Sequence, residues 1–188
     1  MARLSDTATC PLPLVGTDRI LLGHGSGGKL SAALLRDQLM PRFGNPILAE
    51  LGDGAVLSFP GLDLVISTDT FVVNPLEFPG GDIGLLAVHG TANDLAMMGA
   101  EPRYLTAGFV IEEGLPIAVF ERILDSMAGA ARAAGLVIVT GDTKVVERGK
   151  ADGLFVNTTG LGIRHPGFAP GPTRGRPDDV VLVSGPLG

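Results

Sequence analysis

The apolar residues of this chain fall into short runs whose spacing alternates between that of strands and that of helices. Apolar runs over residues 55–59 and 62–68, separated by a Pro-Gly pair, predict a β-hairpin. Apolar residues three and four positions apart predict helices over residues 30–40 and 116–134. Further strands are expected over residues 19–22, 103–111, 136–139, 154–163 and 180–183.

The most informative stretch is residues 82–102, which reads as one helix that is apolar almost all round. Asp82 is the expected N-cap, Gly99 is the expected stop, and Pro102 prevents the helix from continuing. A helix that is apolar on every side is normally buried in the core of a protein. We therefore expect this helix to be buried.

The same helix contains residues that a buried helix normally avoids. Gly84 and Gly90 each cost a helix about 1 kcal/mol relative to alanine, which indicates close approach of another backbone or a ligand. Polar side chains also occur in its middle, at His89, Thr91, Asn93 and Asp94. The helix either holds one satisfied polar cluster in the core or forms part of a binding site.

The order of the predicted elements indicates an α+β fold, with a mixed sheet and helices on one face. Residues 1–18 are expected to form an N-terminal arm, and residues 19–163 one domain. Residues 164–188 are expected to contain a linker rich in proline, glycine and arginine. The linker is then followed by the first strand of a second domain whose remainder is absent from this sequence.

The composition argues against nucleic-acid and membrane partners. The 188 residues include 14 Lys and Arg and 20 Asp and Glu, a formal net charge of −6, which disfavours binding to a nucleic-acid backbone. No uninterrupted apolar run approaches the length of a membrane span, and no secretory signal is evident at the N-terminus. Cys10 is the single cysteine, so no intrachain disulfide forms, which suits a cytoplasmic protein.

A glycine-rich segment, GHGSGGK at residues 23–29, nearly matches the phosphate-binding P-loop, G-x-x-x-x-G-K followed by Ser or Thr. The hydroxyl after the lysine in that pattern binds Mg²⁺, but here Leu30 takes its place and Ser31 comes one position late. We interpret the segment as a lid whose backbone N–H groups and Lys29 reach a phosphate. A flexible surface loop is the alternative.

Aspartates are the candidate metal ligands. Three of them are expected in turns at strand ends and one in the central helix; they are Asp53, Asp69, Asp94 and Asp142. Singly, each is more often a turn former or a cap, but carboxylates from separate elements together suit Mg²⁺ shared with phosphates. In the run GDTK, Asp142 is then expected on the metal and Lys144 on a transferring phosphoryl group or a substrate amide. A surface turn is the alternative for this run.

Four segments of the chain resemble the HypE hydrogenase-maturation proteins, members of the wider PurM-like ATP-binding superfamily. They read LGDGAVL from residue 51, ISTDTFVVNPLEFPGGDIG from residue 66, HGTANDLAMMGAEP from residue 89 and VTGDTKVVERGKADGLFVNTTGLG from residue 139. The resemblance runs from about residue 19 to the end of the chain. These motifs are typical of HypE rather than of the superfamily at large.

The resemblance implies ATP-dependent dehydration of a protein-bound carboxamide. In HypE proteins the partner HypF carbamoylates a C-terminal cysteine, and HypE uses ATP to make the carboxamide oxygen a phosphate leaving group, which produces a thiocyanate. The cyanide passes to the HypC–HypD complex for the iron of nickel–iron hydrogenase. HypE proteins have a second domain and a tail that ends in the acceptor cysteine. Because Cys10 matches no acceptor motif, this chain is not expected to complete the reaction alone.

Carried over by position, the resemblance assigns Mg²⁺-ATP binding to the four aspartates and places Lys144 near the carboxamide. The expected cofactor-binding residues are Lys29, Thr68, Thr91, Asn93, Thr140 and Gly141. The superfamily pairs its first domains across a two-fold axis with strands of both subunits closing a barrel, so a homodimer is expected. Two rival interpretations are a P-loop NTPase and a non-catalytic assembly module that docks HypC–HypD or HypF.

Overall fold

The computed structural model describes residues 19–171, 174–183 and 185, and the chain divides into two compact units. The first ends at Glu50 and the second begins at Leu51. The predicted arm over residues 1–18 lies outside the described residues. Among the described helices, none is long and apolar enough to cross a membrane.

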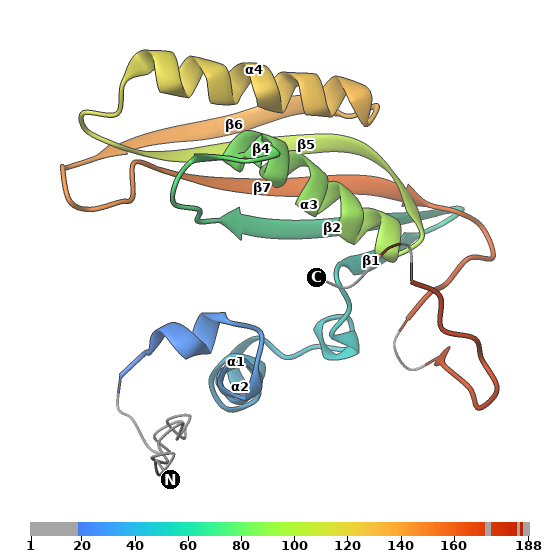
Figure 1. Ribbon diagram of the computed structural model, residues 1–188. Coiled ribbons are helices and arrows are strands. Elements are labelled where there is room, and N and C mark those ends of the chain that lie inside the picture. Colours follow the sequence, from blue (N-terminus) through green and yellow to red (C-terminus); the bar gives the residue numbers. More distant parts are fainter. Residues whose placement is uncertain (1–18, 172–173, 184, 186–188) are drawn as a thin grey trace, which may run out of the picture. The chain divides into compact units, whose positions relative to one another are not determined.

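The larger unit is built on one five-stranded sheet with the order β1-β2-β7-β5-β6 (Figure 1). Its strands are β1 (Ala55–Phe59), β2 (Leu62–Phe71), β5 (Ala100–Glu112), β6 (Val137–Val146) and β7 (Leu154–Arg164). β5 and β6 are parallel, and the other neighbouring pairs are antiparallel. The predicted mixed sheet and the β1–β2 hairpin are therefore confirmed.

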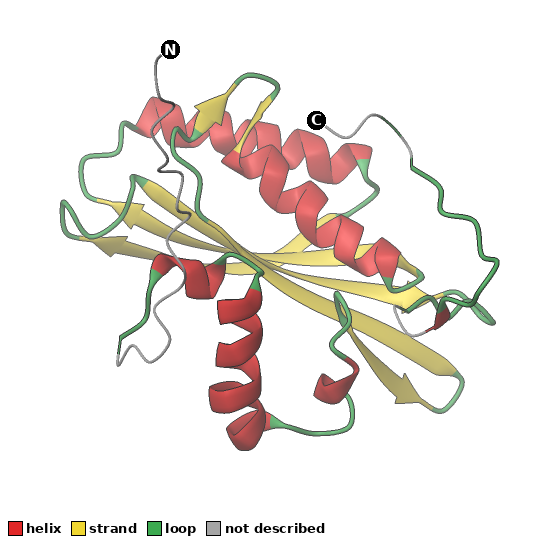
Figure 2. Ribbon diagram, turned by 60° about the horizontal axis from the view of Figure 1, so that its bottom comes forward, coloured by secondary structure: helices red, strands yellow, loops and turns green. Residues whose placement is uncertain are grey.

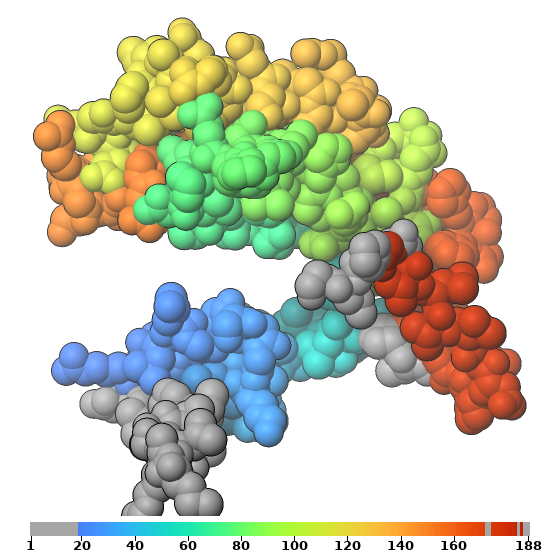
Figure 3. Space-filling model, viewed as in Figure 1, coloured from blue at the N-terminus to red at the C-terminus, as the bar shows by residue number. Residues whose placement is uncertain are grey.

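Two long helices, α3 (Ile83–Met97) and α4 (Ile117–Ala133), cover the same face of this sheet (Figure 2). Their side chains, green and yellow in Figure 3, form a continuous layer. The main core lies between this layer and the central strands, and its largest fully buried members are Ile83, Val88, Leu105, Ile123, Met127, Leu154 and Val156. Helices on one face of the sheet were predicted and are confirmed.

Glycines allow α3 to approach its neighbours closely. A Cβ atom on Gly84 would lie 2.6 Å from the carbonyl oxygen of Ile123 in α4, and one on Gly90 would lie 2.8 Å from the ring of Phe71. On the sheet side, a Cβ on Gly160 of β7 would lie 2.7 Å from the Thr91 methyl group. These distances are below normal van der Waals contact, so a side chain at Gly84 would push α3 away from α4, and one at Gly90 or Gly160 would push α3 away from the sheet.

A buried hydroxyl pair joins α3 to β7 at this point of close approach. Thr91 and Thr158 are fully buried, and their Oγ1 atoms are 2.6 Å apart. Thr158 also donates to the carbonyl oxygen of Ala87, 3.2 Å away. Both hydroxyls are thus satisfied inside the core, as buried polar groups require.

The predicted ends of α3 are confirmed, but its predicted burial is only partly right. Asp82 Oδ1 accepts hydrogen bonds from the N–H groups of Gly84 and Leu85, and Gly99 follows the helix with a φ of +76°. One side of α3 faces solvent, with Leu86 40% and Met97 60% exposed. The apolar character of that side misled the sequence interpretation, because composition alone does not identify the face that packs.

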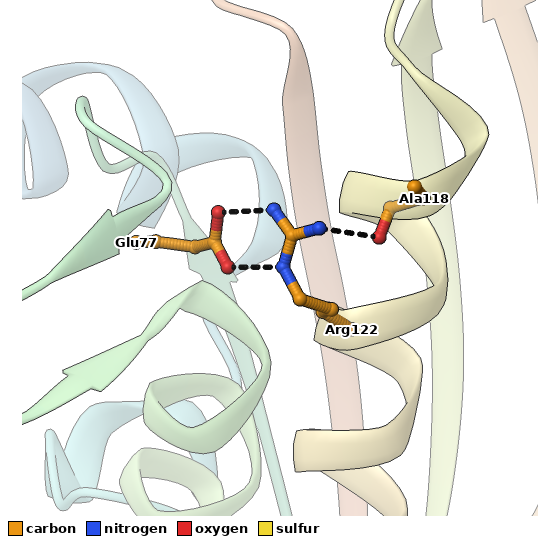
Figure 4. A network of polar contacts seen from close by, with 3 residues as sticks. All are labelled: Glu77, Ala118 and Arg122. Carbon is orange, nitrogen blue, oxygen red and sulfur yellow. Dashed lines mark hydrogen bonds and ion pairs between the residues drawn. The ribbon is translucent and has the colours of Figure 1, made fainter.

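A short hairpin of β3 (Glu77–Phe78) and β4 (Gly81–Asp82) leads into α3 and is tied to α4 by an ion pair. The Arg122 guanidinium donates to both carboxylate oxygens of Glu77 at 2.8 Å and to the Ala118 carbonyl oxygen at 3.0 Å (Figure 4). This geometry holds the loop that precedes α3 against α4. The guanidinium lowers the pKa of Glu77, chiefly through these hydrogen bonds.

In the smaller unit a helical stretch runs through α1 (Lys29–Leu34), a π-helical segment (Leu35–Leu39) and α2 (Met40–Phe43). The helix predicted over residues 30–40 is present but continues past Pro41. The Met40 N–H bonds to the Leu35 carbonyl oxygen, five residues back, so the helix widens just before the proline that cannot donate.

Two predicted strands are wrong. Residues 19–22 form no strand; a 3₁₀ turn, Leu22–Gly25, begins there instead, and the Leu21 N–H donates to His24 Nδ1 at 3.0 Å. Residues 180–183 also form no strand, and their four apolar side chains are exposed. Both segments have strand-like composition, but an extended segment forms a stable strand only where it pairs with a neighbour.

Replacing Gly84 with alanine should destabilise the chain by about 1–3 kcal/mol, because the new methyl group would collide with the Ile123 carbonyl oxygen. Gly129 in α4 is the matched control, since a Cβ at that position would lie 4.0 Å from its nearest neighbouring atom. Gly129→Ala should stabilise by up to about 1 kcal/mol through helix propensity. Urea unfolding of both variants tests this, and equal stability of the two would contradict the packing account.

Candidate functional site

The alternation of side chains along β2 divides the predicted site residues between two faces of the sheet. Ser67 and Asp69 share the helix-covered face with the buried residues Val65 and Phe71. Thr68 lies between them and therefore points to the opposite face, which no helix of this unit covers. We call this opposite face the open face.

On the helix-covered side, α3 and the turn before β1 meet at Ser67. Its hydroxyl oxygen lies 2.9 Å from Asp94 Oδ2 and 2.9 Å from the backbone carbonyl oxygen of Asp53. Gly90 lies one helical turn before Asp94 on α3. Asp69 lies beside it, with its Oδ2 atom 3.7 Å from the position that a Cβ atom on Gly90 would take. The structure therefore brings together three acidic residues from three elements, and we call Asp53, Asp69 and Asp94 the carboxylate cluster.

Asp94 lies in an environment that disfavours its ionised form. Partial burial raises the pKa of Asp94, the hydrogen bond from Ser67 opposes this rise, and the negative charges of Asp69 and Asp53 add to it. Among the ion pairs of the described residues, none involves a member of the cluster. The cluster is thus a concentration of negative charge without a basic counterion in the described part of this chain.

The donor chemistry of the cluster fits a hard cation such as Mg²⁺, which prefers carboxylate oxygens. The described residues nevertheless include no group of three or more His, Cys, Asp or Glu side chains already arranged around a metal position. The cluster is therefore not a closed cage. It suits a cation that keeps several water or phosphate ligands, as Mg²⁺ usually does in nucleotide sites.

The second half of the predicted site lies on β6. Its register with β5 shifts between Leu105 and Thr106, so Val139 is an extra residue that pairs with nothing on β5. After this bulge Thr140, Asp142 and Lys144 pair with Thr106, Gly108 and Val110, which alternate with the buried Leu105 and Ala107. The bulge therefore turns Thr140, Asp142 and Lys144 to the open face.

Gly141 is required at this position for packing. A Cβ there would collide with the carbonyl oxygen of Ala107 on β5. Only glycine lets the two strands approach so closely, which fixes the strand on which Asp142 and Lys144 stand. The predicted cofactor-binding role of Gly141 stays a prediction, and its structural role is clear.

Asp142 and Lys144 form an exposed ion pair, with Nζ 2.7 Å from Asp142 Oδ2. The hydrogen bond from Lys144 lowers the pKa of Asp142, with smaller contributions from the Thr143 backbone N–H and the charge of Lys144. β7 and β5 separate β6 from β2, so the pair lies about 14 Å across the sheet from β2. Within one chain, Asp142 is not part of the carboxylate cluster.

The expectation that three of the four aspartates lie in turns is therefore corrected. Asp69 lies inside β2 and Asp142 inside β6, not in loops after them. The sequence suggests a strand end before the GDTK run because its polar residues interrupt the apolar pattern. Because β6 is an edge strand with an open face, its polar side chains need not be buried. The hydrogen-bonded pairing with β5 therefore continues through them, and β6 extends to Val146.

The remaining predicted residues lie in different environments. Thr68 accepts a hydrogen bond from Thr159 at 3.0 Å on the open face, within a row of hydroxyl-bearing residues. Thr91 is fully buried and paired with Thr158, so it offers nothing to a cofactor. Asn93 is exposed on the solvent side of α3, and Lys29 begins α1 in the smaller unit.

The P-loop interpretation of residues 23–29 gains no support from the local structure. A P-loop follows a strand, whereas this segment begins inside the 3₁₀ turn Leu22–Gly25. Ser31 Oγ accepts a hydrogen bond from the Gly27 N–H at 2.9 Å, so it acts as a local cap of the loop. Lys29 stays a predicted phosphate ligand by virtue of its charge and position.

Sequence reasoning missed Ser67, the residue that links the members of the cluster. A signal was present in the alternation of β2, where Ser67 takes a core-facing position between Val65 and Asp69. A polar residue at such a position normally has a specific partner. The partner could not be identified before the helix was docked on the sheet.

Comparison with known proteins identifies relatives of this chain. Residues 51–164 match the family model of the AIR synthase related protein, N-terminal domain. The carbamoyl dehydratase HypE of Cupriavidus necator is 51% identical over 175 residues, which cover 93% of this chain and 50% of that protein. HypE of Escherichia coli K12 is 50% identical over 176 residues, which cover 91% of this chain and 52% of that protein. The chain thus spans about half the length of these curated relatives.

Solved structures agree with this relationship. A structure of HypE in complex with ATP matches with a TM-score of 0.61 and 53% identity, over 85% of this chain and 47% of that one. A chain in a HypE–HypF complex matches with a TM-score of 0.67 and 50% identity, over 72% of this chain and 43% of that one. A thiamine monophosphate kinase from Aquifex aeolicus, 13% identical with a TM-score of 0.55, shares the fold.

Asp94→Asn should raise the melting temperature of the ligand-free chain at pH 7 by about 1–2 °C. The pKa of Asp94 is higher in the folded than in the unfolded chain, so its ionised form costs stability above that pKa. The cost disappears as pH falls and the carboxyl is protonated, so the advantage of the variant should shrink below that pKa.

Asp142→Asn is the matched control for this experiment, because the pKa of Asp142 is lowered and its ionised form is favoured in the folded chain. This variant should leave the melting temperature at pH 7 unchanged or lower it. Scanning calorimetry between pH 4 and pH 8 measures both. A lower melting temperature for Asp94→Asn at pH 7 would contradict the assignment of electrostatic strain to Asp94.

Proposed function

Because the chain belongs to the AIR synthase related family and is similar to HypE over about half the length of that protein, we propose that it is the ATP-binding part of a carbamoyl dehydratase. The observation that carries this proposal is the carboxylate cluster, in which α3, β2 and the turn before β1 converge on Ser67. An uncompensated group of carboxylates is the chemistry that a Mg²⁺-nucleotide requires. The proposed setting is the cytoplasmic maturation of nickel–iron hydrogenase.

The proposed reaction converts an S-carboxamide of a C-terminal cysteine into a thiocyanate. The carboxamide oxygen attacks the γ-phosphorus of ATP, and the bond between that phosphorus and the β,γ-bridging oxygen breaks to release ADP. The nitrogen loses two protons while the carbon–oxygen bond breaks, and phosphate leaves with the former amide oxygen. The products are the thiocyanate, ADP, phosphate and the two protons, which pass to the phosphate and to solvent, so atoms and charge balance without an external oxidant or reductant.

In this proposal the described residues bind and orient the reactants. Asp53, Asp69 and Asp94 would hold Mg²⁺, which when bound neutralises phosphate charge. Lys29 would contact a phosphate, and Lys144 would stabilise negative charge on the transferring group or the carboxamide. Asp142 keeps Lys144 in place through the ion pair. HypF as carbamoyl donor and HypC–HypD as cyanide acceptor are the proposed partners.

A homodimer would bring the two separated halves of the site together. In one chain Asp142 and Lys144 stand on the open face, away from the carboxylate cluster. The open face also carries a hollow of about 460 Å³ lined in part by Leu64, Tyr104 and Ile163. We propose that two copies pair and that β6 of each copy completes the nucleotide site of the other.

Asp94→Asn and Asp142→Asn should each weaken the binding of Mg²⁺-AMPPNP by about tenfold or more, a cost of roughly 1.4 kcal/mol or more. Asp125→Asn, on the exposed side of α4, is the control and should have no effect. Isothermal titration calorimetry measures the three affinities. Unchanged affinity in both test variants would refute the assignment of the carboxylates to Mg²⁺-nucleotide.

An equimolar mixture of the same two variants tests the shared site. In a mixed dimer one site carries both substitutions and the other carries neither, so random pairing should restore about one quarter of the wild-type sites. If each chain binds nucleotide with its own Asp94 and Asp142, the mixture should restore none. Calorimetric stoichiometry distinguishes the two outcomes.

The rival P-loop interpretation makes the opposite prediction for Ser31. A P-loop hydroxyl binds Mg²⁺, so its removal would abolish Mg²⁺-AMPPNP binding. Because Ser31 caps the loop through the Gly27 N–H, we expect Ser31→Ala to change affinity less than about threefold, a local effect of one exposed hydrogen bond. Loss of binding in Ser31→Ala would favour the P-loop NTPase.

A further inference from the structure

Among the described residues, Ser67 is the side chain that connects two members of the carboxylate cluster by hydrogen bonds. It is 6% exposed, and it stands on β2 directly beneath α3. Its oxygen lies at the same distance, 2.9 Å, from a side-chain oxygen of α3 and from a main-chain oxygen of the turn before β1. Because this hydroxyl contacts two other elements, it links them in addition to satisfying its own hydrogen-bonding capacity.

Apart from the hydrogen bond from Ser67, the turn that carries Asp53 is held by close packing around its two glycines. Gly52 and Gly54 flank Asp53, and a Cβ on Gly52 would lie 3.1 Å from the sulfur of Met98, while one on Gly54 would lie 2.9 Å from the Ile66 carbonyl oxygen. Because neither glycine has a side chain, the turn packs closely against the end of α3 and against Ile66 of β2. The hydrogen bond from Ser67 to the Asp53 carbonyl oxygen fixes its orientation.

We propose that Ser67 is a positioning residue of the carboxylate cluster, whose hydroxyl holds the Asp94 carboxylate and the Asp53 main chain in register so that both acidic side chains reach one bound cation. The proposal rests on the proposed function, because it takes the cluster to be the Mg²⁺-nucleotide site. The hydroxyl has one proton and faces two acceptors when Asp94 is ionised. It can therefore transmit a change at Asp94 to the Asp53 turn by giving its proton to one acceptor or the other.

A double-mutant cycle separates positioning from simple stability. Ser67→Ala should weaken binding of Mg²⁺-AMPPNP about three- to tenfold, the net value of one buried hydrogen bond. In an Asp94→Asn background the same substitution should cost less than about twofold, because the group through which Ser67 acts has lost its charge. Ser58→Ala, an exposed serine on β1, is the matched control and should have no effect in either background.

A second readout needs no nucleotide and keeps this proposal distinct from the proposed function. Hydrogen–deuterium exchange of residues 51–55 in the ligand-free chain should accelerate in Ser67→Ala, whereas exchange in α4 should not change. Equal losses of affinity in both backgrounds, or no loss in either, would overturn the positioning role. If the wild-type chain binds no Mg²⁺-AMPPNP, the proposed function fails, and unchanged exchange of residues 51–55 in Ser67→Ala would then overturn the link between Ser67 and Asp53 as well.

Discussion

The close approach of α3 to the sheet is the constraint on which the rest of this structure depends. At Gly90 and Gly160 a side chain would collide with Phe71 of β2 or with Thr91 of α3, so missing Cβ atoms set the distance between α3 and the sheet. That distance allows Asp94 on α3 to reach Ser67 on β2 directly. A wider spacing would leave the same residues in place but would separate their oxygens, and the carboxylate cluster would not form.

The sheet also separates two kinds of charge. On the helix-covered side, partial burial raises the pKa of Asp94 and the negative charges of Asp69 and Asp53 raise it further; no ion pair among the described residues offsets these charges. On the open face, Asp142 is neutralised by Lys144. The first arrangement lowers the stability of the ligand-free chain and the second does not. A bound cation would therefore gain more electrostatic free energy at the carboxylate cluster than at the pair of Asp142 and Lys144.

The sequence predicts the parts of this fold that depend on local patterns, and fails where pairing and docking decide. The hairpin before Asp69, the caps of α3 and the reason for Gly84 follow from turn chemistry, capping and the cost of glycine in helices. The extent of β6 does not follow from local patterns, because polar residues on the open face of a strand give the same sequence pattern as a loop. The bulge at Val139, which decides the face of Asp142, has no local signature, and the partner of Ser67 lies 27 residues away on another element. The resemblance to HypE pointed to the four aspartates as a group, but it could not say that one chain brings only three of them together.

The most direct test of this account is the position of a bound cation. Crystals of the chain grown with Mn²⁺ and AMPPNP give an anomalous signal that locates the metal independently of the nucleotide. The account predicts an anomalous peak within about 2.5 Å of carboxylate oxygens from at least two of Asp53, Asp69 and Asp94. A nucleotide bound with its Mn²⁺ at the glycine-rich loop, and no peak at the carboxylate cluster, would contradict it.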